Sequence, residues 1–160
     1  MAKNVVWILQ TGEPLPIDEN SPRPMRSMNI AHELVRKNYK VIIWASNFDH
    51  TQKKFRKKNS CSNKKLIQNI VYNKNYEINL LNSPGYKKNI SLKRFYDHII
   101  LAKNLNFLLD NDISKPDFAI LGFPPIEINY VMAKWLNKNN IPFLIDVKDL
   151  WPETFFEYLP

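Results

Sequence analysis

The feature that most constrains the fold is a set of short, uninterrupted apolar runs spaced along the chain. Residues 5–9 (VVWIL) and 41–45 (VIIWA) are rich in β-branched and aromatic side chains, and residues 118–121 and 142–147 repeat the pattern. A run that is apolar at nearly every position, rather than at every second one, is typical of a strand buried on both faces of a sheet. Residues 76–81 form a fifth expected strand, which ends before Ser-Pro-Gly.

Amphipathic segments separate these runs. Residues 25–37, 91–109 and 126–136 carry apolar side chains at helical spacing. Ser91 is a suitable N-cap for the second segment. The expected apolar faces are Met28, Ala31, Leu34 and Val35 in the first helix, and Phe95, Ile99, Ala102 and Leu109 in the second.

The alternation predicts an α/β fold. Buried strands that alternate with amphipathic helices form a mostly parallel sheet with helices on both faces. We expect a Rossmann-like arrangement in which the five strands, numbered along the chain, have the order 3-2-1-4-5. The length of 160 residues and the hydrophobic fraction of 44% suit one domain spanning residues 1–160.

The chain is basic, with a formal net charge of +8, and one segment concentrates that charge. Residues 53–65 (KKFRKKNSCSNKK) contain seven Lys or Arg and no acid. One interpretation is a solvated loop. The other is peripheral contact with an anionic membrane surface. The residues that would make it are Lys53, Lys54, Arg56, Lys57 and Lys58. The segment has a single aromatic residue, so nucleic acid is not an expected partner.

No metal or disulfide chemistry is expected within the chain. Cys61 is the only cysteine, and the three histidines have no metal-ligand spacing. No apolar run reaches the roughly 18–20 residues of a membrane-spanning helix, and the N-terminus lacks a signal-peptide cleavage pattern. These features predict a cytoplasmic protein. If the protein contacts a membrane, we expect that contact at the inner face of the cytoplasmic membrane.

Three loops after expected strands carry the candidate binding residues. The first contains Thr11 and Gly12 and then Arg23 and Arg26. It lacks the glycine patterns of dinucleotide-binding and P-loop proteins. Arginines near a helix N-terminus favour an anion-binding corner. The alternative is that these arginines form salt bridges to Glu13, Asp18 or Glu19 and so fix the loop.

The second loop, GFPPIE, contributes Gly122, Pro125 and Glu127. Glycine at a strand end permits close approach of a ligand, although turns favour glycine in any case. Glu127 fits the first turn of a helix, where an acid complements the helix dipole.

The third loop, LIDVKDLWPE, places Asp146, Lys148 and Asp149 at the end of an apolar strand. Acids and a base so close together shift one another's pKa values, as at functional sites. The alternative is a local ion pair followed by a helix cap.

Together, WILQTGEPLPID, SPRPMRSMNIAHELVRKNYKVIIWAS, GFPPIE and PFLIDVKDLWPE resemble the N-terminal domain of family-4-type glycosyltransferases with the GT-B fold. The likeness is to bacterial enzymes that build O-antigen, capsule and related surface polysaccharides, and it covers nearly the whole chain.

The resemblance implies a retaining sugar transferase that needs no metal cofactor. Its expected partners are a nucleotide-sugar donor and a saccharide acceptor, often lipid-linked, held in a cleft between two Rossmann-like domains. By this resemblance we expect the chain to be the acceptor-side domain of a truncated protein, without the donor-binding C-terminal domain. By this resemblance Asp149, Asp146 and Lys148 are the expected catalytic residues, with Asp149 nearest the sugar. Thr11, Gly12, Arg23, Arg26, Gly122, Pro125 and Glu127 are the expected substrate-binding residues.

The sequence departs from that family at two places. Many relatives have paired glycines where Thr11-Gly12-Glu13-Pro14 stands, and many have a histidine where Lys148 stands. A protonated lysine is a partner for phosphate or carboxylate rather than a base. The alternative to a transferase domain is a non-catalytic binding module or one subunit of a split glycosyltransferase. Either way, we expect the 160-residue chain alone to be inactive.

Overall fold

The computed structural model describes residues 4–19, 22–56, 66–111 and 113–148. The elements in chain order are β1 (Val5–Leu9), α1 (Arg26–Arg36), β2 (Lys40–Ser46), β3 (Phe48–Asp49), β4 (Lys54–Phe55), β5 (Ile67–Asn73), β6 (Tyr76–Leu81), α2 (Leu92–Leu109), β7 (Phe118–Phe123), α3 (Ile126–Lys138) and β8 (Phe143–Val147).

The main sheet has six strands in the order β5-β6-β2-β1-β7-β8. The pairs β6–β2, β2–β1, β1–β7 and β7–β8 are all parallel. The predicted α/β class and the predicted order of the five strands are therefore confirmed. Strand β5, which pairs antiparallel with β6 at one edge, was not predicted. Its side chains are mostly exposed, so its sequence lacks the apolar character by which the other strands of this sheet were predicted.

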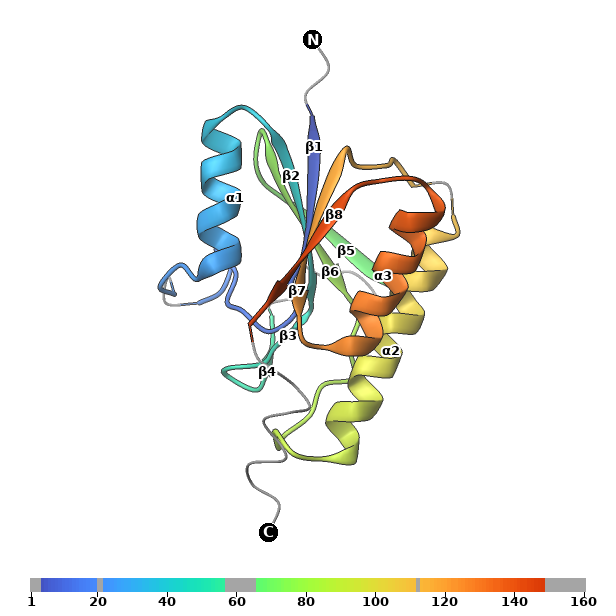
Figure 1. The fold of residues 1–160 in the computed structure, drawn as a ribbon. Helices are drawn as coiled ribbons and strands as arrows, with labels where there is room; N and C mark the ends of the chain where they lie inside the picture. Colours follow the sequence, from blue (N-terminus) through green and yellow to red (C-terminus); the bar gives the residue numbers. More distant parts are fainter. Residues whose placement is uncertain (1–3, 20–21, 57–65, 112, 149–160) are drawn as a thin grey trace.

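Helices cover both faces of the sheet, as predicted: α1 lies on one face, and α2 and α3 lie together on the other (Figure 1). Because successive strand residues point to opposite faces, Val6 and Ile8 pack in the core on the α1 side, and Trp7 and Leu9 pack in the core with α2 and α3. Trp7 stacks on Trp135 of α3, with a ring-centroid distance of 5.5 Å.

The helix ends follow the sequence closely. Ser91 is the N-cap of α2, and its hydroxyl accepts a hydrogen bond from the Arg94 backbone N–H at 3.2 Å. The predicted burial of Phe95 is wrong, because the first turns of α2 leave this side chain exposed. The buried face of α2 starts at Asp97 and continues through Leu101, Ala102, Leu105 and Leu109.

Two further expectations need correction. The start of the basic segment is not a loop, because β3 and β4 pair as a small antiparallel sheet. Strand β8 is also not buried on both faces, since Leu144, Ile145 and Val147 are exposed. Its position at the edge of the six-stranded sheet explains this exposure. No helix in the described part of the chain combines the length and apolar character of a membrane span.

Candidate functional site

A cavity of about 300 Å³ lies where β1 and β7 end. The chain runs from β1 to β2 on one side and returns to β7 on the other, so this is the point where strand order reverses. Crevices at such reversal points, outside the carboxyl ends of the strands, are the usual ligand sites of open α/β sheets. The lining residues include Gln10, Thr11, Gly12 and Glu13 after β1, Pro124 and Pro125 after β7, and Lys148 after β8.

Two further cavities adjoin this central one. A cavity of about 890 Å³ toward α1 shares Glu13, Met25 and Lys148 with it. A cavity of about 200 Å³ toward α2 and α3 shares Arg94, His98, Pro124 and Pro125 with it. The three cavities therefore form one groove along the carboxyl edge of the sheet, and we call it the edge groove.

The centre of the edge groove contains an ion pair between Lys148 and Glu13, residues 135 positions apart. Glu13 is buried, and it also accepts a hydrogen bond from the Ser27 backbone N–H at 2.9 Å, in the first turn of α1. Burial alone would raise the pKa of the Glu13 carboxyl. The hydrogen bonds from Lys148 and Ser27 outweigh that effect and hold the pKa below its usual value. Glu13 is therefore ionised at neutral pH.

A second ion pair lies beside the first, between Arg26 at the start of α1 and Asp146 at the end of β8. The Lys148 ammonium is 3.8 Å from the other carboxylate oxygen of Asp146. The structure thus brings together Arg26, Asp146 and Lys148, which the sequence placed in two separate loops. Glu13 completes this network, although the sequence offered it only as a possible partner of the loop arginines.

The two loop arginines have different surroundings. Arg23 is exposed and lines the larger cavity together with Arg26. The alternative, in which the pair fixes the loop by salt bridges to Glu13, Asp18 or Glu19, fails for the first two acids and stays a prediction for Glu19. Glu13 pairs with Lys148 and Asp18 pairs with Arg56.

The first loop is shaped by Gln10, a residue that sequence reasoning missed. Its side-chain oxygen accepts the Gly12 N–H at 2.8 Å. A Cβ built at Gly12 would lie 3.8 Å from that same oxygen, which is an ordinary contact. Thr11 lines the cavity. Packing therefore does not require glycine at position 12, and the open space beside it faces the groove.

Gly122 has a different role, because it lies inside β7 rather than beyond it. A Cβ there would lie 2.9 Å from the Gln10 amide nitrogen and 3.1 Å from the Leu9 carbonyl oxygen. Glycine at this position lets β7 pack closely against the end of β1. Close packing of the two strands, which the sequence analysis did not consider, accounts for this glycine, and Gly122 is absent from the lining of the described cavities.

Pro125 and Glu127 occupy the start of α3, as expected. Pro125 is the N-cap residue, and its carbonyl oxygen accepts the Asn129 side-chain amide at 2.6 Å. Glu127 is 3.6 Å from the His98 ring on α2. That contact holds the pKa of the Glu127 carboxyl below its usual value. Glu127 therefore joins the two helices at the edge groove.

An aromatic and basic cluster, not predicted from the sequence, forms the wall toward α2. The His50 Nδ1 atom contacts the Tyr86 hydroxyl, and the Lys53 ammonium is 3.3 Å from the same ring nitrogen. Since an ammonium group can only donate, this nitrogen accepts and the ring is neutral. Burial, reinforced by Lys53 and Arg94, lowers the pKa of His50 to about 4. Burial likewise raises the pKa of Tyr86 to about 12.

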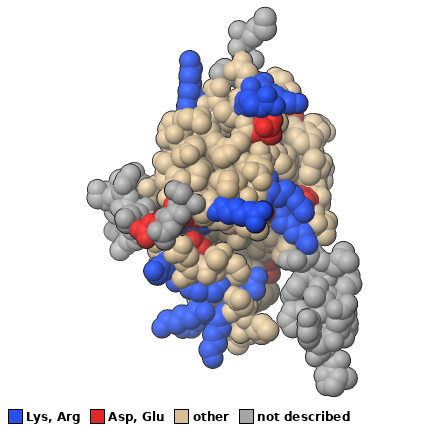
Figure 2. Space-filling view, turned by 90° about the vertical axis from the view of Figure 1, so that its left-hand side faces the viewer, with Lys and Arg blue, Asp and Glu red and all other residues tan. Residues whose placement is uncertain are grey.

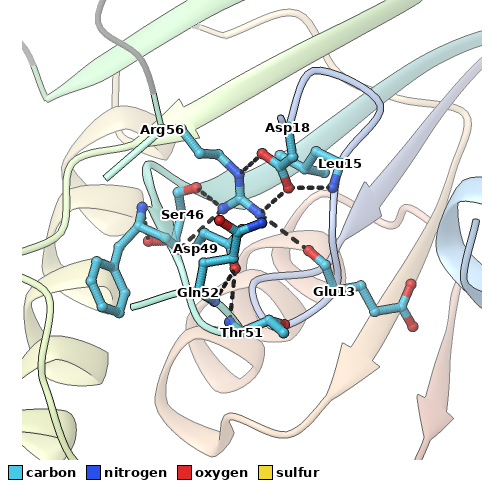
Figure 3. Close-up of polar contacts among 9 residues, drawn as sticks. Glu13, Leu15, Asp18, Ser46, Asp49, Thr51, Gln52 and Arg56 are labelled. Atoms are coloured by element: carbon cyan, nitrogen blue, oxygen red, sulfur yellow. Dashed lines mark hydrogen bonds and ion pairs between the residues drawn. The ribbon is translucent and has the colours of Figure 1, made fainter. Parts of the chain in front are cut away.

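Arg56 does not belong to an anionic-surface contact, because it is buried. Its guanidinium binds both carboxylate oxygens of Asp18, at 2.6 and 2.9 Å (Figure 3). It also donates to the backbone carbonyls of Ser46, Phe48 and Glu13. Arg56 therefore fastens the first loop to the end of β2.

Of the other predicted surface residues, Lys54 is exposed on β4, and Lys53 binds the Asn89 side chain. Lys57, Lys58 and Asp149 lie outside the described residues. Within the described part of the chain, no group of three or more His, Cys, Asp or Glu is arranged to hold a metal ion.

The edge groove combines carboxylate acceptors with ammonium and guanidinium donors. Such groups bind hydroxyl groups and phosphates. No family model matches the chain, and no curated protein matches it.

Proposed function

We propose that this chain is the acceptor-side domain of a retaining, family-4-type glycosyltransferase with the GT-B architecture. The enzyme would move a sugar from a nucleotide-sugar donor to a lipid-linked saccharide in bacterial surface polysaccharide synthesis. The observation that supports this most directly is the position of the edge groove at the reversal point between β1 and β7. The motif resemblance described above points to the same residues.

In this proposal the groove is one wall of a cleft, and a second Rossmann-like domain forms the other. Gly12 leaves room beside β1, and Thr11 adds a hydroxyl to the lining of the cavity there. Arg23 is exposed at the α1 end of the groove, where an arginine suits a phosphate. Asp146 and Lys148 hold one another in position beside the reacting sugar.

One observation favours the second candidate, a binding module or one subunit of a split enzyme. The charged groups at the centre of the groove pair with each other, Lys148 with Glu13 and Arg26 with Asp146. A carboxylate held in an ion pair is a poor proton acceptor. Such a network suits ligand binding as well as it suits catalysis.

The test begins with the native gene product, isolated from the source cell with an antibody against this domain and weighed by intact mass spectrometry. That product is then assayed for transfer of radiolabelled sugar from a panel of nucleotide sugars to a lipid extract of the same cell. The key variants are Thr11→Val, because valine has the shape of threonine, and Gly12→Ala, because a Cβ there makes only an ordinary contact. The matched control is Lys74→Gln, an exposed change in the β5–β6 turn at the opposite edge of the sheet.

We expect the native product to transfer sugar and both groove variants to lower that activity at least about tenfold. A tenfold loss corresponds to about 1.4 kcal/mol of lost transition-state binding. The control should keep full activity. Activity that appears only after a second polypeptide is added would identify a split enzyme. Ligand binding without transfer would identify a binding module. Equal activity in all variants would refute the placement of the site.

A further inference from the structure

The loop before α2 and its first turns, residues 86–96 (YKKNISLKRFY), carry the most exposed large apolar side chains of the described chain. Leu92 is 88% exposed and Ile90 is 81% exposed. We call this stretch the α2 entry segment. Single exposed apolar residues are common on protein surfaces, but neighbouring ones that form a patch mark an interaction site.

The exposure is imposed by local hydrogen bonds that hold the backbone. The Ser91 hydroxyl donates to the Lys88 carbonyl at 2.9 Å and accepts from the Arg94 N–H at 3.2 Å. The Arg94 guanidinium donates to the Asn89 carbonyl at 3.0 Å. The loop is thus tied at three points, and it presents Ile90 and Leu92 outward.

The apolar surface continues from the loop onto both helices. Phe95 and Tyr96 are exposed and lie three and four residues after Leu92, on the same side of α2. Ile90 and Phe95 face Ile126 of α3 across the cavity of about 200 Å³. The result is one apolar patch built from two helices and a loop.

The same segment is purely basic. Residues 86–96 contain Lys87, Lys88, Lys93 and Arg94 and no acid, and the three lysines are exposed. Lys53 adds a further cation, because its ammonium binds the Asn89 side chain. Figure 2 shows Lys and Arg side chains projecting from the lower end of the molecule.

We infer that the α2 entry segment docks on an anionic lipid bilayer, with Ile90 and Leu92 entering the interface and the lysines contacting the headgroups. Exposed aliphatic side chains flanked by lysines match both parts of such a surface, the acyl boundary and the negative headgroups. A protein interface core, in contrast, is depleted in lysine. This surface is built on residues 86–96 and not on the basic segment at residues 53–65, of which Lys53 alone is included.

The docking surface and the edge groove lie at the same end of the molecule, where α2 begins and β1 and β7 end (Figure 1). Arg94 and His98 line both the central cavity and the cavity beside Ile90. The inference rests on the proposed function only in that a lipid-linked acceptor would reach the groove from this surface. Docking itself requires no sugar transfer.

Sedimentation of the chain with lipid vesicles tests the inference. The vesicles contain either phosphatidylcholine alone or phosphatidylcholine mixed with phosphatidylglycerol, at low and high salt. The variants are Ile90→Ser with Leu92→Ser, and Lys87→Gln with Lys88→Gln. The control is Val71→Ser with Lys74→Gln, which removes an apolar side chain that is 67% exposed and a lysine at the far edge of the sheet.

We expect the chain to bind the anionic vesicles and to lose that binding at high salt. The lysine variant should lower the partition coefficient about fivefold for each lysine removed. The apolar variant should lower it at least about tenfold, since each side chain loses most of its transfer free energy. The control should match the parent chain.

Three outcomes would overturn the inference: no binding to anionic vesicles, equal losses in the control, or unchanged binding in the apolar variant. Light scattering in the absence of lipid tests the alternative occupant of the patch, a second copy of the chain. Self-association that Leu92→Ser abolishes, without salt-sensitive vesicle binding, would assign the patch to a second copy of the chain. Vesicle binding by the chain, together with a native gene product that transfers no sugar, would support the docking surface and refute only the proposed function.

Discussion

Arg56→Met should strongly destabilise the fold. The side chains of Arg56 and Asp18 are each 4% exposed, and the guanidinium binds both oxygens of the carboxylate. Methionine fills similar volume but leaves the Asp18 charge buried, with the Leu15 N–H as its remaining side-chain hydrogen-bond donor among the described residues. Removing one member of a buried ion pair costs about 3–5 kcal/mol. Three backbone carbonyls also lose their donor, so we expect a loss of about 4 kcal/mol in the free energy of unfolding.

The assay is urea unfolding followed by tryptophan fluorescence. With a denaturant slope of about 2 kcal/mol per molar urea, the midpoint should fall by about 2 M. Asp18→Asn and the double variant complete a mutant cycle. The double variant should be more stable than the sum of the single losses predicts, because neither charge is then left alone.

The control is Arg36→Met, which removes a fully exposed pair with Glu33 on α1 and should leave the midpoint unchanged. A midpoint shift below about 0.5 M for Arg56→Met would refute the reasoning, since it would correspond to only about 1 kcal/mol. It would mean that Asp18 is solvated and that the first loop is fastened by other contacts.

Three further predictions concern the site. Because the pKa of His50 lies near 4 in the folded chain and near 6.5 when unfolded, acid favours unfolding. The free energy of unfolding should fall by about 2 kcal/mol as pH drops from 6.5 to 4, after allowing for solvent around a half-buried ring. In His50→Gln the urea midpoint should depend less on pH over this range. Glu13→Gln should cost about 2 kcal/mol at pH 7. The folded-state pKa of Glu13 is depressed, so the stability difference between the parent chain and Glu13→Gln should vanish as pH falls below 4.5 and through that depressed pKa. Urea unfolding at a series of acid pH values measures the difference. Gly122→Ala should cost about 1–3 kcal/mol by calorimetry, since its Cβ meets Gln10 and Leu9, whereas Gly12→Ala should cost nothing measurable.

Each of these predictions has a contradicting result. If the stability of His50→Gln depends on acid pH as strongly as that of the parent chain, the His50 ring is solvated. A stability difference for Glu13→Gln that persists at low pH would place the effect in packing rather than charge. Equal costs at the two glycines would contradict the different space that surrounds them.

The sequence alone determined the layered fold and the strand order. Five runs are apolar enough to identify strands without any knowledge of their neighbours: residues 5–9, 41–45, 76–81, 118–121 and 142–147. Short connections and right-handed crossovers then leave few topologies. The order 3-2-1-4-5 follows from that, and so does the position of the loops at one edge of the sheet. The capping role of Ser91 was also predictable from the sequence, because a cap contacts only the first turn of its own helix.

Tertiary structure alone decided which charges are buried, paired or exposed. Arg56 looks like its lysine neighbours in the sequence, and only the approach of Asp18 from 38 positions away buries it. Glu13 and Lys148 meet across 135 positions. Phe95 and Leu92 fit a helix face by their spacing, yet the sheet ends before it reaches them. Periodicity records what a residue does within its own element. The charge pairing and exposure of a residue depend on which other element packs against its own element. No local sequence pattern encodes that packing.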